Sequence, residues 1–175
     1  GGECSYWACI PSKTLLRPGE AVQDAREAAA TADVDVQAAF AWRDFMVSDW
    51  SDAGQVRWLG EHRIDLLRGS GRLAGTGVVE VDGVRHTAEH VVLANGADAA
   101  IPPIPGLPEL DGVWTSREAT SMKTVPRRLL IVGGGPVGLE MAQVVHRLGG
   151  EAVVLEMSEH VLSREPAPLG EGLCE

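Results

Sequence analysis

The 175-residue sequence is poor in cysteine and in basic side chains. Three cysteines are too few for the disulfide framework of a small secreted domain. Only 15 Lys and Arg residues stand against 25 Asp and Glu residues, which gives a formal net charge of −10. Because nucleic acids and anionic membrane surfaces recruit clustered Lys and Arg, this balance argues against both kinds of partner.

The sequence also lacks an apolar run long enough to cross a bilayer. The best candidate, residues 129–145, contains Glu140 and a glycine-rich turn. The first residues show no basic or apolar leader region, and we expect a cytoplasmic protein. The last residues form no evident closing element, so we expect a fragment of a longer chain. With 45% hydrophobic and 23% charged residues, the chain is not expected to be disordered.

Glycine, by contrast, is abundant at 21 residues and marks many of the expected element boundaries. Residues 5–32 have a helical composition, and we expect the Pro18-Gly19 pair to break that helix in two. A second helix is expected over residues 37–62, where apolar side chains recur at a spacing close to 3.6.

Residues 64–93 have the composition of short strands separated by glycine. We expect strands at residues 64–67, 77–81 and 90–93 in a small antiparallel meander, with Asp82-Gly83 as a hairpin turn. The proline-rich residues 101–108 are expected to form a stiff, extended connection between two lobes.

The C-terminal third of the chain predicts a strand, a helix and a second strand. The strands are expected at residues 128–132 and 152–156, with the helix between them at residues 136–148 and closed by Gly149-Gly150. Such a βαβ unit belongs to the α/β fold class and contains parallel strands.

The turn between the first strand and the helix is the best-defined motif. It reads Gly133-Gly134-Gly135-Pro136-Val137-Gly138 and satisfies the pattern G-x-G-x-x-G. In this pattern the first glycine makes the tight turn, the second lets the backbone approach a pyrophosphate, and the third lets the helix pack on the strand. The helix N-terminus then offers N–H groups and a partial positive charge to the anion. We predict a dinucleotide-binding site at residues 133–138.

An acidic residue, Glu156, ends the second strand. Its carboxylate would accept hydrogen bonds from a ribose hydroxyl and would repel a 2′-phosphate, so NAD is predicted in preference to NADP. The alternative is a glycine-rich turn that binds no ligand, with Glu156 solvated. The complete strand–helix–strand context favours the binding site.

Cys4 and Cys9 form a pair separated by four residues. This is not the spacing of zinc ribbons or thioredoxin-like motifs, and no paired histidines follow, so no metal site is predicted. On a regular helix the two Cα atoms would lie about 8 Å apart or more, beyond disulfide reach. A bond between them requires a distorted first turn, which would make it easily reduced.

The surroundings of the two cysteines suggest reactive thiols. A helix N-terminus and the nearby Lys13 should lower the pKa of both thiols. The spacing by itself leaves a second interpretation open, namely two unrelated buried cysteines.

Residues 1–13, GGECSYWACIPSK, resemble the redox-active segment of the pyridine nucleotide–disulfide oxidoreductases. This is the flavoprotein group of dihydrolipoamide dehydrogenase, glutathione reductase and mercuric reductase. Residues 93–96, 103–106 and 115–118 also look familial, and the resemblance runs over essentially the whole chain. It implies FAD- and NAD(P)-binding Rossmann-like domains with a small β-meander, incomplete at both ends. Residues 1–122 would belong to the FAD-binding domain and residues 123–175 to the start of the NAD-binding domain.

The resemblance also implies roles for individual residues. Cys9 would be the thiol near the flavin that forms the charge-transfer thiolate, and Cys4 the thiol that exchanges with the substrate disulfide. Lys13 would lie near the flavin N5 and pair with Glu140. The other cofactor contacts implied are Gly2, Gly71, Ala94, Asn95 and Gly96 for FAD, and Gly133, Gly135, Pro136, Val137, Gly138 and Glu156 for NAD.

The function implied is electron transfer between NAD(H) and a disulfide or dithiol substrate, small or protein-bound, through FAD and the Cys4–Cys9 pair. A homodimer is expected for the full-length protein. Alternatives are a mercuric reductase, an NADH:quinone or oxygen oxidoreductase, and an inactive truncated fragment. The family's first glycine motif for FAD and its His–Glu pair are missing, so residues 1–175 alone are expected to bind FAD poorly and not to turn over. The five histidines are expected to be ordinary surface or helix residues, and Cys174 a buried helix thiol.

Overall fold

The computed structural model describes residues 2–173, so Cys174 lies outside the described residues. The chain forms two compact units. One comprises residues 50–96 with Gly2, and the other comprises residues 3–49 and 97–173. The predicted boundary at residue 122 between two cofactor domains stays a prediction.

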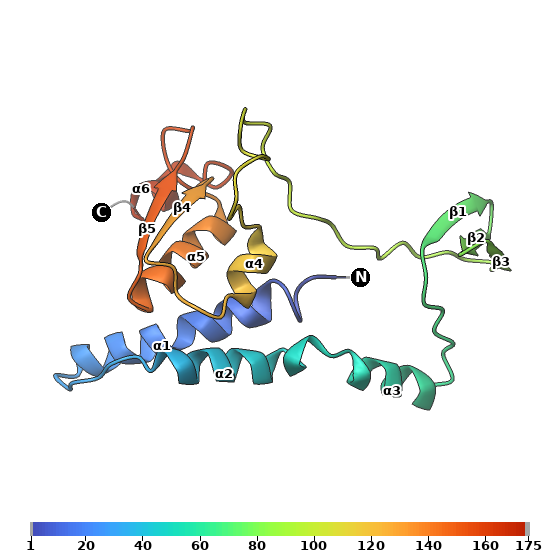
Figure 1. Ribbon diagram of the computed structural model, residues 1–175, viewed down its shortest axis with the longest axis horizontal. Coiled ribbons are helices and arrows are strands. Elements are labelled where there is room, and N and C mark those ends of the chain that lie inside the picture. The colour runs from blue at the N-terminus through green and yellow to red at the C-terminus, as the bar shows by residue number, and fades with distance from the viewer. Residues whose placement is uncertain (1, 174–175) are drawn as a thin grey trace. The chain divides into compact units, whose positions relative to one another are not determined.

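The larger unit is a layered α/β arrangement. Figure 1 shows α5 lying against the two-stranded sheet β4–β5, with α1 on the side of α5 away from the sheet and α2 alongside α1. The elements are α1 (Cys9–Glu27), α2 (Val36–Met46), α4 (Ser116–Ser121), β4 (Arg128–Val132), α5 (Pro136–Arg147), β5 (Glu151–Leu155) and α6 (Ala167–Glu171).

The core of this unit lies where the four helices meet. On α5 the buried positions follow the i, i+3, i+4 spacing that places side chains on one helix face. Burying each large side chain stabilises the fold by about 1.5–3 kcal/mol. The core residues are Leu15 and Leu16 from α1, Ala39 and Phe40 from α2, Ala119 and Met122 at α4, and Met141, Val144, Val145 and Leu148 at α5.

The first helix differs from the expected one at both its start and its middle. It begins at Cys9 rather than at residue 5, and it continues through Pro18 to Glu27. Proline at this position removes the hydrogen bond that the Thr14 carbonyl would accept, but its φ angle is compatible with a helix. The two pieces stay in one helix because Leu15, Leu16 and Gly19 are all buried against neighbouring helices.

The helix expected over residues 37–62 is also divided. α2 ends at Met46, a 3₁₀ turn η1 (Ser48–Trp50) follows, and α3 (Ala53–Glu61) begins afterwards. Ser48, Asp49 and Trp50 all have φ near +50°, which ends the helical hydrogen-bond ladder. Ser and Asp tolerate this because their side chains compete with helical backbone bonds.

The smaller unit contains α3 and an antiparallel three-stranded sheet of β1 (Gly71–Gly75), β2 (Val78–Val81) and β3 (Val84–Thr87). The predicted hairpin is confirmed, since Val81 pairs with Val84 across Asp82-Gly83, both of which have positive φ. Residues 64–67 and 90–93 were expected as strands and are not. Among residues 2–173 no strand pairs with them, and a strand needs a partner for its backbone groups.

The βαβ unit is confirmed as predicted. β4 and β5 pair in parallel from Arg128 opposite Glu151 to Val132 opposite Leu155, and α5 connects them. Residues 101–108 contain no helix or strand, but the expectation of an extended connection between two lobes is wrong. The segment turns where the Leu107 N–H donates to the Ile104 carbonyl at 3.0 Å, and it belongs to the larger unit.

We predict that Gly19→Val lowers the free energy of unfolding by about 1–3 kcal/mol, because it overpacks the α1–α5 contact. A Cβ at Gly19 would lie 2.6 Å from Cδ and 2.8 Å from Cβ of Arg147. Chemical denaturation measures the effect. The matched control is Gly60→Val on α3, where a Cβ meets nothing within 4 Å, so a change within about 0.5 kcal/mol is expected. Equal losses in the two variants would contradict the prediction.

Candidate functional site

The glycine-rich turn at residues 133–138 joins β4 to α5 and is closed by tight backbone packing. Gly133 has φ of +108°, a conformation that favours glycine, and its N–H donates to the Leu155 carbonyl at 2.8 Å. A Cβ at Gly138 would lie 2.3 Å from the Gly133 carbonyl oxygen and 3.1 Å from Cγ2 of Ile131. The third glycine therefore allows α5 to approach β4, as its place in the motif predicts.

The middle of the turn has space for a ligand. Gly135 is the N-cap of α5, and a Cβ built on it meets nothing within 4 Å. Pro136 occupies the first helical position, where its missing N–H costs nothing. The Val137 side chain is 56% exposed at the same helix end. An open backbone surface at the N-terminus of a 12-residue helix fits a dinucleotide phosphate.

Glu156 is anchored in the turn rather than simply solvated. One carboxylate oxygen accepts from the Gly134 N–H at 2.7 Å and the other accepts from the Ser158 N–H at 2.8 Å. These backbone hydrogen bonds, first from Ser158 and then from Gly134, lower the pKa of Glu156 to about 2. The carboxylate is therefore ionised at neutral pH and holds the second residue of the glycine motif in place.

The two cysteines are attached to different kinds of backbone. Cys9 is the first residue of α1, whereas Cys4 lies in a turn around the Glu3 carbonyl. This carbonyl accepts hydrogen bonds from the N–H groups of Trp7 at 2.8 Å and Ala8 at 2.9 Å. The Cys4 carbonyl in turn accepts from the Ile10 N–H at 2.9 Å. This wrapped turn, residues 3–9, is called the dithiol loop below. It removes the distance problem that two cysteines on one regular helix would have.

The thiols are free, exposed and close together. A hydrogen bond with Cys9 raises the pKa of the Cys4 thiol above its usual range, and it outweighs the opposing effect of the Lys13 charge. The expectation of a lowered pKa is therefore wrong for Cys4, because the proton that Cys4 shares with Cys9 is held in place. The interpretation of two unrelated buried cysteines is also wrong.

Lys13 lies one helical turn after Cys9 on the same face of α1. Its ammonium pairs with Glu140 of α5 at 2.5 Å, so the structure brings together the two residues that the resemblance paired. The Lys13 side chain is 60% exposed. Cys9 and Lys13 border a groove of about 510 Å³ whose other side includes Trp42 and Met46 of α2. An exposed thiol and an ammonium beside such a groove fit the edge of a flavin ring.

The remaining candidate cofactor residues lie in the smaller unit. Gly71 begins β1, and Ala94, Asn95 and Gly96 lie in an exposed segment without helix or strand. The Asn95 amide donates to the Gly96 carbonyl at 2.9 Å, and Gly96 has φ of +75°. Gly2 is exposed. Their contact with FAD stays a prediction.

No motif in the sequence predicted the contacts between α4 and the dithiol loop. The Arg117 guanidinium donates to the Glu3 carboxylate at 3.0 Å and lies 5.9 Å from the centre of the Trp7 ring. The Thr120 hydroxyl lies 3.3 Å from the Trp7 carbonyl. The one available signal was Thr115-Ser116-Arg117-Glu118, which forms a capping box that starts α4 here.

The described residues show neither a metal centre nor a membrane span. Among residues 2–173 no group of three or more His, Cys, Asp or Glu side chains could hold a metal ion. In the same part of the chain, no helix has both the length and the apolar character needed to cross a bilayer.

The βαβ unit with its open glycine-rich turn is the arrangement of a dinucleotide-binding fold. Comparison with known families agrees, because the model of the pyridine nucleotide-disulphide oxidoreductases matches residues 1–173. The chain belongs to this family of FAD-dependent enzymes.

The relatives are named for different enzymes of the family. A mercuric reductase from Lysinibacillus sphaericus is 30% identical and aligns with 99% of this chain and 33% of its own length. A dihydrolipoyl dehydrogenase from Thermus scotoductus is 35% identical over 97% of this chain and 38% of its own length. The chain thus spans about a third of these relatives.

A solved structure also matches. The Cu(II) complex of the HOCl-induced flavoprotein disulfide reductase RclA from Escherichia coli superimposes with a TM-score of 0.82 at 25% identity, covering 99% of this chain and 38% of that one. The predicted fold class is confirmed by this match and by the family model.

Proposed function

We propose that these residues belong to an enzyme that transfers electrons between NAD(H) and a disulfide or dithiol substrate through FAD and the Cys4–Cys9 pair. The observation that carries the proposal is the dithiol loop, in which the exposed Cys4 thiol hydrogen bonds with Cys9. Cys9 in turn lies one helical turn before Lys13, which pairs with Glu140. The open turn at Gly135 supports the nucleotide half of the proposal.

The chain's own residues divide the work between the two sulfurs. Cys4 lies on the loop, exposed to a substrate, and is the thiol that exchanges with the substrate disulfide. The hydrogen bond with Cys9 raises the pKa of the Cys4 thiol, so in the reduced form Cys4 keeps its proton beside Cys9. Cys9 and Lys13 would border bound FAD, and Lys13, oriented by Glu140, would supply a positive charge beside it. Bound FAD would supply a two-electron relay between nicotinamide and disulfide.

The test is anaerobic reduction of the full-length protein. One equivalent of NADH and a proton should convert the Cys4–Cys9 disulfide to two thiols and release NAD⁺. Alkylation and mass spectrometry should then find two new thiols in the tryptic peptide that ends at Lys13. If NADH is consumed and this peptide stays disulfide-bonded, the proposal is wrong.

A second candidate is reduction of mercuric ion, for which the relatives named mercuric reductase provide the reason. Two adjacent thiols are suitable ligands for a soft metal ion. Steady-state rates with lipoamide, glutathione disulfide, Hg²⁺ and a quinone, each at matched NADH, separate the candidates. A homodimer and a cytoplasmic location stay predictions.

We also expect a nucleotide preference. The full-length protein should use NADH at least tenfold more efficiently than NADPH, because Glu156 faces the ribose and a carboxylate repels a 2′-phosphate. One charge-assisted hydrogen bond contributes about 1.5–3 kcal/mol, which corresponds to a factor of ten or more. The values of kcat/KM for both nucleotides measure this, and Glu156→Gln should narrow the ratio while Glu159→Gln leaves it unchanged. Equal efficiency with both nucleotides would instead direct attention to Arg164 as a phosphate ligand.

A further inference from the structure

We infer that Arg117 is a positioning residue for the redox pair: it holds the dithiol loop so that the Cys4 and Cys9 sulfurs stay within bonding reach. This inference rests on the proposed function, because it assigns the Cys4–Cys9 pair a reversible disulfide. Arg117 touches neither sulfur and acts through Glu3 and Trp7.

The contacts of Arg117 bracket Cys4 on both sides. Its guanidinium bonds to the Glu3 carboxylate, immediately before Cys4, and lies over the Trp7 ring, three residues after it. Glu3 also supplies the carbonyl around which the loop turns. A side chain that fixes Glu3 therefore fixes the centre of the turn that carries Cys4.

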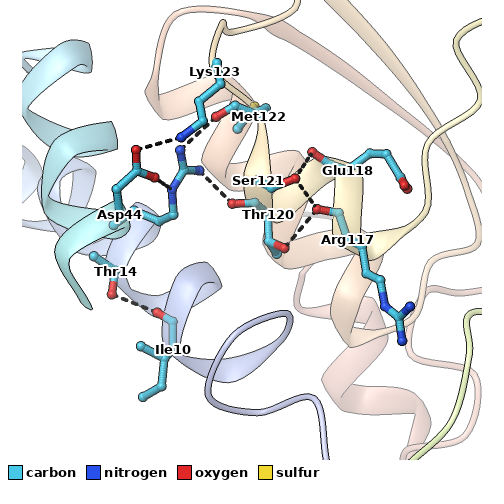
Figure 2. A network of polar contacts seen from close by, with 10 residues as sticks. Ile10, Thr14, Asp44, Arg117, Glu118, Thr120, Ser121, Met122 and Lys123 are labelled. Carbon is cyan, nitrogen blue, oxygen red and sulfur yellow. Dashed lines mark hydrogen bonds and ion pairs between the residues drawn. The ribbon is translucent and has the colours of Figure 1, made fainter. Parts of the chain in front are cut away.

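The guanidinium is itself held in place. Asp98 lies 3.1 Å from the same Nη2 atom that bonds to Glu3, and the pKa of Arg117 is raised, chiefly by the hydrogen bond to Glu3. α4, which carries Arg117, is anchored from behind. The buried Arg43 donates to the carbonyls of Thr120 at 2.6 Å and Met122 at 2.9 Å. In Figure 2 the Arg117 side chain extends away from Met122 and Lys123. Arg43 therefore holds the C-terminal end of α4, while Arg117 near its N-terminal end contacts the dithiol loop.

The expected consequence is thermodynamic. Forming the disulfide with glutathione disulfide removes two electrons and two protons from Cys4 and Cys9, and both appear on two glutathione thiols. A loop that is already ordered loses less conformational freedom when the ring closes. Without the contacts of Arg117, the loop gains conformational freedom in the dithiol form, whereas in the disulfide form the closed ring still restricts it. Restricting the backbone of one more residue changes such an equilibrium constant by about tenfold.

The experiment measures this constant in the full-length protein. Samples are equilibrated anaerobically in glutathione buffers of defined ratio, quenched with acid and alkylated, and the disulfide fraction of the peptide ending at Lys13 is measured by mass spectrometry. Arg117→Ala should lower the equilibrium constant for disulfide formation about tenfold, a potential about 30 mV less negative. Glu3→Gln should lower it similarly, and the double variant should show no further loss. Arg26→Ala, which removes an exposed arginine paired with Asp33 at 4.0 Å, is the matched control and should change nothing.

The outcomes separate this inference from the proposed function. An unchanged constant in folded Arg117→Ala, or additive effects in the double variant, overturns the inference and leaves the function standing. If the wild-type pair equilibrates with glutathione but NADH does not reduce it, the proposed function is wrong. The effect of Arg117 on the disulfide equilibrium can still be measured in that case. Should Arg117→Ala fail to fold by thermal melting, Glu3→Gln carries the test, since the Glu3 side chain is 30% exposed and its loss leaves α4 intact.

Discussion

Replacing Cys9 with serine should abolish the long-wavelength thiolate-to-flavin absorbance that we expect from the full-length protein after two-electron anaerobic reduction. Disulfide-dependent turnover should be lost in the same variant. The reason is that Cys9, on α1 beside Lys13, is the sulfur we place against the flavin. Cys4→Ser should behave differently and show the band without any reductant, because its Cys9 sulfur can no longer enter a disulfide.

The absorbance spectra of the two variants decide between the sulfurs. A band that survives in Cys9→Ser, or a spectrum that Cys4→Ser shares with the oxidised wild type, would mean that the two roles are reversed or wrong.

Arg43→Met should lower the free energy of unfolding by about 3–5 kcal/mol, a large part of the 5–15 kcal/mol typical of a domain. The Arg43 side chain is fully buried. Its guanidinium donates to the Asp44 carboxylate and to the carbonyls of Thr120 and Met122, and these three acceptor residues are labelled in Figure 2. A methionine fills similar space but leaves the carbonyls of Thr120 and Met122 without their donor.

Denaturation of paired variants isolates the cause. Burial alone would raise the pKa of Asp44, but hydrogen bonds from Lys123 and Arg43 outweigh it and lower the pKa. Lys123→Met removes an exposed partner of Asp44 and should cost less than about 1 kcal/mol. A similar loss in both variants would show that the charge of Asp44, rather than the buried carbonyls, carries the effect.

The local parts of the structure could be predicted from the sequence. The β4–α5–β5 unit was predictable because hydrophobic runs, glycines and a terminal acid agree within 30 residues. The Asp82-Gly83 hairpin was predictable for the same reason, since both left-handed turn positions are encoded by the residues that occupy them.

The features that could not be predicted from the sequence depend on contacts between distant segments. Arg43 and Thr120 are 77 positions apart, and Arg117 and Glu3 are 114 apart, so neither a buried arginine nor a clamp on the loop is visible in any local window. Pro18 was misinterpreted because its local cost is outweighed by packing on Leu15 and Leu16. The start of α1 was misplaced because residues 5–8 have helical composition, but the N–H groups of residues 6–8 all donate to the Glu3 carbonyl instead.

The different backbone settings of Cys4 and Cys9 also determine which part of the chain moves when the disulfide forms or breaks. α1 continues from Cys9 into buried Pro11, Ser12 and Leu15, so the helix offers little compliance at that end. Cys4 has only the short turn from Glu3 behind it. When a sulfur–sulfur bond forms or breaks, the displacement is therefore absorbed by Cys4 and its immediate neighbours, and the helix packing against α2 and α5 stays still.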